Sequence, residues 1–413
     1  MATKWDVFSW LYEQSGPRKI IGIVKGLNQK RSEYDKIRKI LDVLVQSKLV
    51  TKTKHGFERV MNDKNQHFFT LLKYCMKNGV NYNEVCNETV AGYVSKAFLK
   101  KSFTAKDIRL HPRTFGRVSH ILEKHGFLIV LSRKPFNAII PYNSFLGDLV
   151  TFYGHRPLVA RQKRDEYFGE IKKELSKFNK LKSRNLRAYH DILEAFQIKF
   201  VHHSLSIEGN PLTLVQTARL LRDKIVSENL ALEAVQEVQN YQKAFLQTLQ
   251  NVRDEVPLTK ESMLNYHFTA LQHKSKWAGK IRDDPVTIKG NKHFKLAKPK
   301  EIERLLDSLI KDYNDFVKTK HALKEIIDFA AYLHNEFQYI HPFFDGNSRT
   351  TRLITFHFLQ MNGIPVFDIP LGMLEQYVSA TKGAKKRDEQ QLAQELQQII
   401  LYNLKTINKK LSQ

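Results

Sequence analysis

One short segment of the chain concentrates the residue types that handle a phosphorylated nucleotide. It reads Ile-His-Pro-Phe-Phe-Asp-Gly-Asn-Ser-Arg-Thr-Thr-Arg over residues 340–352. Within it stand an imidazole that can act as a base, His341, and a carboxylate that can bind a hard cation, Asp345. Two permanently charged guanidinium groups follow, Arg349 and Arg352. Side chains of these types at this spacing indicate a site for a phosphate-containing ligand.

Two helices must hold this segment in place. Upstream, apolar residues recur at steps of three and four and predict a helix over 322–339 with one buried face. Downstream, a second helix is expected over 349–361. The loop that carries Gly346 and Asn347 into this helix leaves unpaired backbone N–H groups at its start, where the helix dipole also favours an anion. The predicted ligand is therefore phosphate.

The composition is that of an ordinary soluble protein with a helical bias. The 413 residues, 42% of them hydrophobic and 26% charged, suffice for two or three domains. No apolar run approaches the roughly 20 residues that span a bilayer, and no leader pattern opens the chain, so a cytoplasmic protein without a membrane partner is expected. Cys75 and Cys86 have neither metal-site nor disulfide spacing and are expected as buried free thiols.

The positive charge is concentrated near the N-terminus. The whole chain carries a net charge of +25, and residues 1–150 contain 26 lysines and arginines against 12 acidic residues, a net +14. A polyanion such as DNA is the natural partner of such a surface, through phosphate neutralisation and counterion release. A generally basic, soluble surface is the alternative.

Residues 1–61 and 62–150 are each predicted to form a winged-helix domain. In the first, three helices within 6–47 precede a hairpin over 49–60. The cations that would face a major groove there are Lys30, Arg31, Lys36, Arg38 and Lys39. The second has a candidate recognition helix over 112–126, with Arg113, Arg117 and Lys124, and a wing over 127–141. Winged helices that dock a protein instead of DNA remain the alternative.

The rest of the chain is predicted to be helical. Residues 151–185 form a charged connecting helix, and from 186 to 413 helix follows helix. The exception is 285–299, a predicted hairpin whose first strand holds Val286, Thr287 and Ile288. A lone hairpin on a helical domain can serve as a flap that docks a substrate.

The segment from His341 to Arg352 resembles the signature of Fic-domain enzymes, usually His-Pro-Phe-x-Asp/Glu-Gly-Asn-Gly/Lys-Arg-x-x-Arg. The resemblance covers about residues 186–400. It implies a mainly α fold, an all-helical Fic domain with a β-hairpin flap, here preceded by tandem winged-helix (α+β) domains. Fic enzymes typically transfer AMP from ATP to a Ser, Thr or Tyr hydroxyl of a protein, although some use other phosphate-containing donors.

The resemblance assigns roles to the charged residues. His341 would be the general base that takes the proton of the target hydroxyl. Asp345 would hold Mg²⁺ between the α- and β-phosphates. Arg349 and Arg352 would neutralise the β- and γ-phosphates.

Other positions follow from the same resemblance. Gly346, Asn347 and the Ser348 backbone would form the anion hole, and Tyr377 is expected near the adenine. Ser348 stands where the family has Gly or Lys. If the backbone there needed a positive φ, serine would cost on the order of 1 kcal/mol. The flap over 286–294 would align the target as an added strand.

Residues 204–210, Ser-Leu-Ser-Ile-Glu-Gly-Asn, resemble the Ser/Thr-x-x-x-Glu-Gly/Asn motif of Fic proteins with an autoinhibitory helix. Ser204 and Glu208 are four residues apart and share one helix face, so Glu208 could pair with Arg352. That pair would occupy the arginine meant for the γ-phosphate. ATP would then bind in a nonproductive pose.

The leading interpretation is an autoinhibited protein adenylyltransferase that uses ATP and Mg²⁺, modifies a protein hydroxyl, its own included, and is targeted by basic winged helices. One alternative is a DNA-binding regulator whose weakly active Fic fold senses nucleotide. Another is a Fic transferase with a different phosphate donor. Pairing into a homodimer stays open, since Fic domains often pair.

Overall fold

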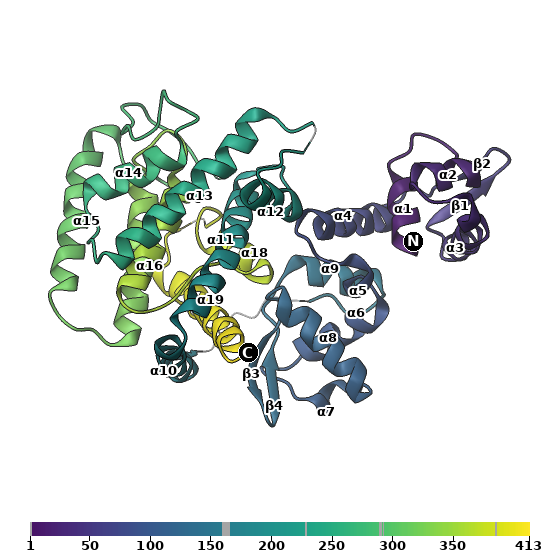
Figure 1. The fold of residues 1–413 in the computed structure, drawn as a ribbon, viewed down its shortest axis with the longest axis horizontal. Helices are drawn as coiled ribbons and strands as arrows, with labels where there is room; N and C mark the ends of the chain where they lie inside the picture. The colour runs from purple at the N-terminus through teal and green to yellow at the C-terminus, as the bar shows by residue number, and fades with distance from the viewer. Residues whose placement is uncertain (1, 159–165, 228, 289–290, 292, 385) are drawn as a thin grey trace. The chain divides into compact units, whose positions relative to one another are not determined.

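The computed structural model describes residues 2–158, 166–227, 229–288, 291, 293–384 and 386–413 (Figure 1). Contacts within the chain divide it into two compact units, residues 1–160 and 161–413. The predicted boundaries at 61, 150 and 185 remain predictions. Each unit is considered by itself.

The N-terminal unit contains two antiparallel hairpins among short helices. Its elements are α1 (Lys4–Tyr12), α2 (Ile20–Gly26), η1 (Arg31–Glu33), α3 (Tyr34–Gln46), β1 (Val50–Thr53), β2 (Gly56–Arg59), α4 (Asp63–Lys77), α5 (Tyr82–Val85), α6 (Glu88–Phe98), α7 (Ala105–Ile108), α8 (Pro112–Lys124), β3 (Ile129–Arg133), β4 (Phe136–Ile139) and α9 (Ser144–Phe152). Strand β1 pairs with β2, and β3 with β4. The hairpins lie within the predicted wing segments, whereas α5, α6 and α9 are helices that the sequence patterns do not predict. Assignment of this unit as winged helices stays a prediction.

Side-chain caps and aromatic packing explain much of this unit. Thr3 and Asp6 form a reciprocal capping box at the start of α1, and Asn62 caps α4. Phe68 on α4 packs with its ring centroid 4.5 Å from that of Trp5 on α1. Cys75 and Cys86 are buried and unlinked, as expected.

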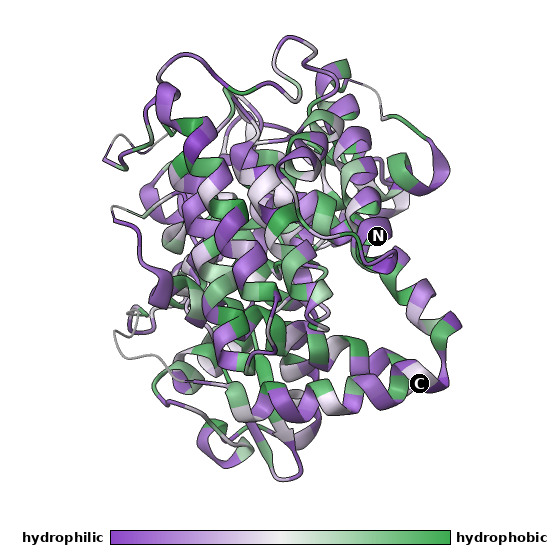
Figure 2. Cartoon of the chain, turned by 90° about the vertical axis from the view of Figure 1, so that its left-hand side faces the viewer, coloured by the Kyte–Doolittle hydropathy of each residue, from purple (hydrophilic) through white to green (hydrophobic). Residues whose placement is uncertain are grey.

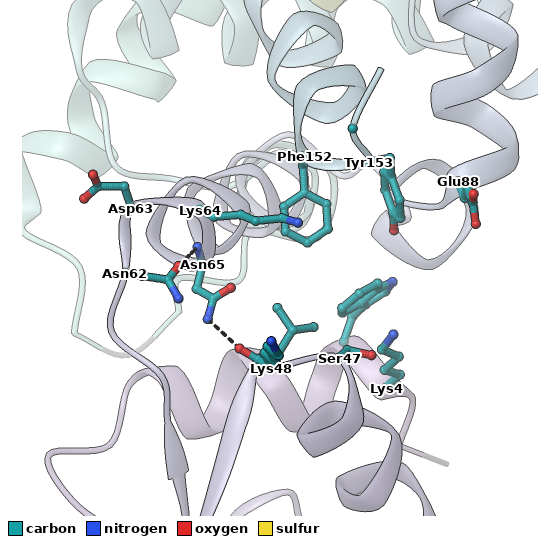
Figure 3. A pocket seen from close by; sticks show the side chains of 13 residues that line it. Lys4, Ser47, Lys48, Asn62, Asp63, Lys64, Asn65, Glu88, Phe152 and Tyr153 are labelled. Atoms are coloured by element: carbon teal, nitrogen blue, oxygen red, sulfur yellow. Dashed lines mark hydrogen bonds between the residues drawn. The ribbon is translucent and has the colours of Figure 1, made fainter. Parts of the chain in front are cut away.

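A hollow of roughly 750 Å³ lies within the N-terminal unit, lined by α1, α4, α9 and the turn between α3 and β1 (Figure 3). Lys64 extends over the ring of Phe152, with its ammonium 5.0 Å from the ring centroid. The amide of Asn65 donates to the carbonyl of Lys48. None of the predicted nucleotide-site residues lines this hollow, so the candidate active site lies elsewhere.

The C-terminal unit is built of helices. Its elements are α10 (Phe168–Arg184), α11 (Leu186–Glu208), α12 (Leu214–Asp223), α13 (Leu232–Arg253), α14 (Lys260–Ala270), η2 (Pro299–Glu301), α15 (Ile302–Val317), α16 (Leu323–Ile340), α17 (Asn347–Met361), η3 (Leu371–Met373), α18 (Leu374–Ala380) and α19 (Glu389–Leu411). Helices α16 and α17, which flank the motif loop, pack against each other and are covered by α13, α14, α15 and α19. Helix α17 buries almost every residue along its length. The predicted mainly α fold class is confirmed.

Hydropathy follows the packing. Helices in Figure 2 alternate hydrophilic and hydrophobic residues along their length, as helices with one buried face do. Among the described residues, none of the helices combines the length and apolar character that crossing a bilayer requires.

The flap region is only partly described. Ile288 and Asn291 form a single antiparallel bridge, and residues 289, 290 and 292 lie outside the described residues. Of the three flap residues singled out in the sequence, Thr287 is exposed, Val286 is half-buried and Ile288 is buried. The predicted hairpin over 285–299 is thus represented by this one bridge.

Buried neutral histidines make the stability of the C-terminal unit sensitive to acid. On α17, His357 accepts a hydrogen bond from the Tyr266 hydroxyl, 2.7 Å away, and donates to the carbonyl of Val256, 2.9 Å away. Burial lowers its pKa to about 4. The unfolded chain, with an ordinary histidine pKa, therefore binds a proton between about pH 6.5 and pH 4 that the folded chain does not, so stability falls as pH falls through this window.

We expect His357 alone to remove about 2 kcal/mol of stability between pH 6.5 and pH 5. Replacing it by glutamine, which keeps polar atoms but does not titrate, should make the fall of unfolding temperature with acid shallower. Calorimetric melts of the full chain at several pH values measure this. An unchanged slope in His357→Gln would contradict the assignment.

Candidate active site

Two residues with left-handed backbone bracket the motif loop. Helix α16 ends at Ile340 and is followed by His341, whose φ is +48°, and α17 begins after Gly346, whose φ is +80°. The first is unusual because a non-glycine side chain disfavours this region, and such strain persists only where the surroundings enforce it. The loop between them is therefore held by contacts from outside the motif.

Arg282 supplies one of these contacts. Its Nε donates to the His341 carbonyl at 2.7 Å, and its backbone N–H donates to the Pro342 carbonyl at 2.8 Å. A terminal nitrogen donates to the Ala297 carbonyl at 2.6 Å. The side chain is buried, and its guanidinium donates to backbone carbonyls. It thereby fixes the residue at which α16 stops.

His341 is positioned as a neutral imidazole. Its Nδ1 lies 3.2 Å from the carbonyl of Gln338. A carbonyl can only accept, so Nδ1 carries the proton and Nε2 keeps its lone pair. Burial lowers the pKa of His341 to about 4, so the ring stays neutral at physiological pH. This is the protonation state that a general base requires.

Uncharged contacts shape the middle of the loop. The amide of Asn347 accepts from the Phe343 backbone N–H at 3.0 Å and donates to the Phe343 carbonyl at 2.7 Å. The Phe343 ring stacks on His267, 3.5 Å between centroids. His267 accepts from the Gly279 N–H at Nδ1 and donates from Nε2 to the Asp345 carbonyl. The side chain of Asn347 thus braces the loop.

Asp345 is ionised and paired with two cations. Its oxygens lie 2.7 Å from Arg349 and 3.0 Å from Lys274. Burial by itself would raise the pKa of this carboxyl, but Arg349 and Lys274 hold that pKa well below its usual range. One half-buried, ionised carboxylate fits Mg²⁺, which takes few protein oxygens and completes its shell with water and phosphate. Among the described residues no cluster of three or more acidic, histidine or cysteine side chains suits a metal.

The two arginines of the motif have different partners. Arg349 pairs with Glu237 on α13 as well as with Asp345. Arg352 is 1% exposed. Its Nε donates to the Ser204 hydroxyl at 2.5 Å, and its terminal nitrogen donates to the Ser204 carbonyl and to Glu208 Oε1, at 3.1 and 3.0 Å.

Helix α11 therefore lies with the predicted inhibitory face against α17. Ser204 also donates its hydroxyl proton to the Tyr241 hydroxyl at 2.8 Å, and Tyr241 donates to the Arg349 carbonyl. Glu208 pairs with Lys382 in addition to Arg352. Burial by itself would raise the pKa of Glu208, but the charges of Arg352, Lys382 and Arg349 lower that pKa. The carboxylate is thus ionised.

Two further predicted residues lie beside the loop. Ser348 is the second residue of α17, and its φ is not positive, so serine carries none of the left-handed strain considered from the sequence. Tyr377 on α18 is buried, with its hydroxyl 2.7 Å from Nε2 of His334. Its place beside an adenine stays a prediction.

Part of the chain is similar to known proteins. Residues 257–359 match the model of the Fic/DOC family. Curated relatives named "Protein adenylyltransferase Fic" include one from Drosophila persimilis, 24% identical over 290 residues that cover 67% of this chain and 54% of the relative. Another, from Nematostella vectensis, is 25% identical over 258 residues, 62% of this chain and 58% of the relative. The chain spans about half the length of the curated relatives it matches.

Two solved structures are also similar. A Fic domain containing signaling protein from Bacteroides thetaiotaomicron is 26% identical, with a TM-score of 0.49, and covers 59% of this chain and 97% of its own. Fic-1 from C. elegans is 17% identical, with a TM-score of 0.47, and covers 92% of each chain.

The family match covers the motif loop together with α14, α15, α16 and most of α17. The chain contains a Fic domain. The family match begins at residue 257 and so does not include the N-terminal unit.

Gly346 allows a direct test of the loop. A Cβ added there would stand 2.6 Å from Leu271 Cδ2 and 3.1 Å from His267 Nε2. Gly363 has a similar φ of +73°, but a Cβ there meets nothing within 4 Å. We expect alanine to cost both sites about 1 kcal/mol of backbone strain. Only Gly346→Ala should also weaken binding of ATP, the nucleotide predicted from the sequence, because the loop must move.

Unfolding midpoints and ATP titrations of the two variants measure these effects. Equal ATP affinity in Gly346→Ala and Gly363→Ala would contradict a rigid phosphate loop at this position.

Proposed function

We propose that the protein is an autoinhibited protein adenylyltransferase, which transfers AMP from ATP to a hydroxyl side chain of a protein, its own included. The observation that carries the proposal is the fixed tautomer of His341, whose Nε2 lone pair is available on a loop that opens a helix. The relatives named protein adenylyltransferase support the same activity.

The residues would divide the reaction between them. His341 Nε2 takes the proton of the target hydroxyl as its oxygen attacks the α-phosphorus, and pyrophosphate leaves as the P–O bond to it breaks. The backbone N–H groups at the start of α17, at Asn347 and Ser348, hold phosphate oxygens. Arg349 and Arg352 stabilise the negative charge on the leaving pyrophosphate.

Asp345 would hold Mg²⁺ next to these groups. Bound there, the ion would neutralise charge on the α- and β-phosphates. Lys274 and Arg349 both pair with this carboxylate, so at least one carboxylate oxygen would have to leave its cation to bind the ion. Tyr377 would lie near the adenine, and the flap with Val286, Thr287 and Ile288 would align the target.

Inhibition would follow from the contact between Glu208 and Arg352. While the carboxylate occupies the guanidinium, the γ-phosphate cannot, and ATP lies with its α-phosphate out of line for attack. Ser204 supports the pair from one turn earlier on α11.

Substitution separates these roles. We expect Glu208→Gly to raise AMP transfer at least about tenfold, because the competing ion pair is lost. His341→Ala should lower transfer in that background by a factor of about 10² to 10⁴, because the general base is gone. Transfer is measured with ATP labelled at the α-phosphate and by the intact mass of the full chain.

A matched control is Glu174→Gly. The side chain of Glu174 is about as little exposed to water as that of Glu208, and it pairs with Lys405 on α19. Among the described contacts, Glu174 touches no residue of the motif. It should leave transfer unchanged. An inactive Glu208→Gly variant that still binds ATP would move the assignment to another phosphate donor or to a nucleotide sensor.

A second function, DNA binding, is favoured by the surface of α8. Arg113, Arg117, His120 and Lys124 are exposed at steps of three and four and so share one face. Gly116 lies among them, and a Cβ there would meet nothing within 4 Å. The following hairpin adds exposed Arg133 and Lys134. A cationic helix face beside a basic hairpin suits a DNA groove and its phosphates.

Charge reversal tests this surface. We expect Arg113→Glu with Arg117→Glu to weaken binding of duplex DNA and to lower the salt slope of the affinity by roughly 2, one for each lost phosphate contact. Lys172→Glu with Lys173→Glu on α10 changes the net charge equally and should have little effect. Equal losses in the two double variants would indicate a general charge effect and no DNA site on α8.

A further inference from the structure

The inhibitory carboxylate is held by two cations, only one of which belongs to the Fic motif. Glu208 Oε1 lies 3.0 Å from the terminal nitrogen of Arg352, and Oε2 lies 3.3 Å from the ammonium of Lys382. Lys382 also donates to the carbonyl of Ile207 at 2.8 Å. The carboxylate therefore bridges a guanidinium from α17 and an ammonium from the loop after α18.

The loop that carries Lys382 is fixed by its own contacts. Asn291, a buried flap residue, donates from its amide to the carbonyls of Lys382 and Ala384, at 3.0 and 2.8 Å. The N–H of Gly383 donates to the carbonyl of Val378 at 2.8 Å. The backbone that carries the ammonium toward Glu208 is thus held by contacts from Asn291 and Val378.

If Glu208 left the site, Arg352 and Lys382 would both lose their carboxylate partner. Arg352 is 1% exposed and Lys382 is 22% exposed, so neither cation is fully screened by water. With the carboxylate gone, both would point at the space between them, and a buried cation without an anion is costly. An anion with several oxygens is the chemical group that relieves this.

We propose that Lys382 is a phosphate-binding residue of the nucleotide site, which binds the terminal phosphates of ATP together with Arg352 once Glu208 withdraws. The inference rests on the proposed function in one respect, that the site takes a nucleoside triphosphate. In the resting protein Glu208 stands in for the phosphate, with one oxygen on each cation. The sequence of the 341–352 motif gives no indication of a role for Lys382, which lies thirty residues after its last residue.

Lys382 then has opposite effects in the two states. It stabilises the inhibitory carboxylate at rest, and it stabilises the triphosphate when Glu208 has left. Its contribution to nucleotide binding is therefore measured where the carboxylate is absent.

The experiment compares ATP and AMP binding by calorimetric titration of the full chain. In the Glu208→Gly background we expect Lys382→Ala to weaken ATP binding about tenfold, as the loss of one charged hydrogen bond does. AMP, which lacks the terminal phosphates, should bind with unchanged affinity. Lys386→Ala, an exposed lysine of the same loop, is the matched control and should change neither.

Each outcome has a meaning. Unchanged ATP affinity overturns the proposal and leaves Lys382 as a partner of Glu208 only. Equal losses for ATP and AMP also overturn it, because they would report a disturbed loop. AMP transfer by Glu208→Gly is measured separately, so a protein that binds ATP through Lys382 without transferring AMP would refute the proposed activity and leave this inference standing.

Discussion

The arrangement of the site depends on one buried charge. A guanidinium as enclosed as Arg352 must have acceptors within reach, since an unpaired buried cation would cost several kcal/mol. The acceptors come from a single turn of α11, through the hydroxyl and carbonyl of Ser204 and the carboxylate of Glu208. Helix α11 must therefore lie against α17 at this register, and Tyr241 on α13 joins the same network.

The loop separates contacts that shape it from contacts that can exchange. Its shape is kept by Arg282 on carbonyls, by the Asn347 amide and by the neutral His267 ring. The exchangeable contacts are ion pairs at Asp345 and the two arginines. A ligand that replaces the second set leaves the first intact. The strained backbone at His341 can then stay in place throughout a reaction.

Much of this could be read from the sequence, and the reason is local spacing. The helices on both sides of the motif and their order follow from periodicity. The pairing of Glu208 with Arg352 was expected from the resemblance of residues 204–210 to an inhibitory motif, with Ser204 and Glu208 four residues apart on one face. Lys274, Arg282 and Lys382 could not be found this way, because they reach the loop from other helices and connections and no short pattern links them to it. Helices α6 and α9 were not predicted, although each has buried apolar residues at helical spacing, for example Val90, Val94 and Ala97 in α6. Ser348 does not have the positive φ considered from the sequence, because α17 begins at Asn347, two residues earlier than its periodicity suggested.

The ion pairs of the resting site have a consequence for energetics. The carboxylates of Asp345, Glu208, Glu233 and Glu237 already pair with the four cations of the site, which are Lys274, Arg349, Arg352 and Lys382. Binding of the proposed nucleotide would then be an ion exchange, in which phosphate oxygens compete with carboxylates for the same cations. The gain is a difference between two similar interactions, so affinity can remain modest despite four cations. Small displacements of α11 would be enough to change which anion the site prefers.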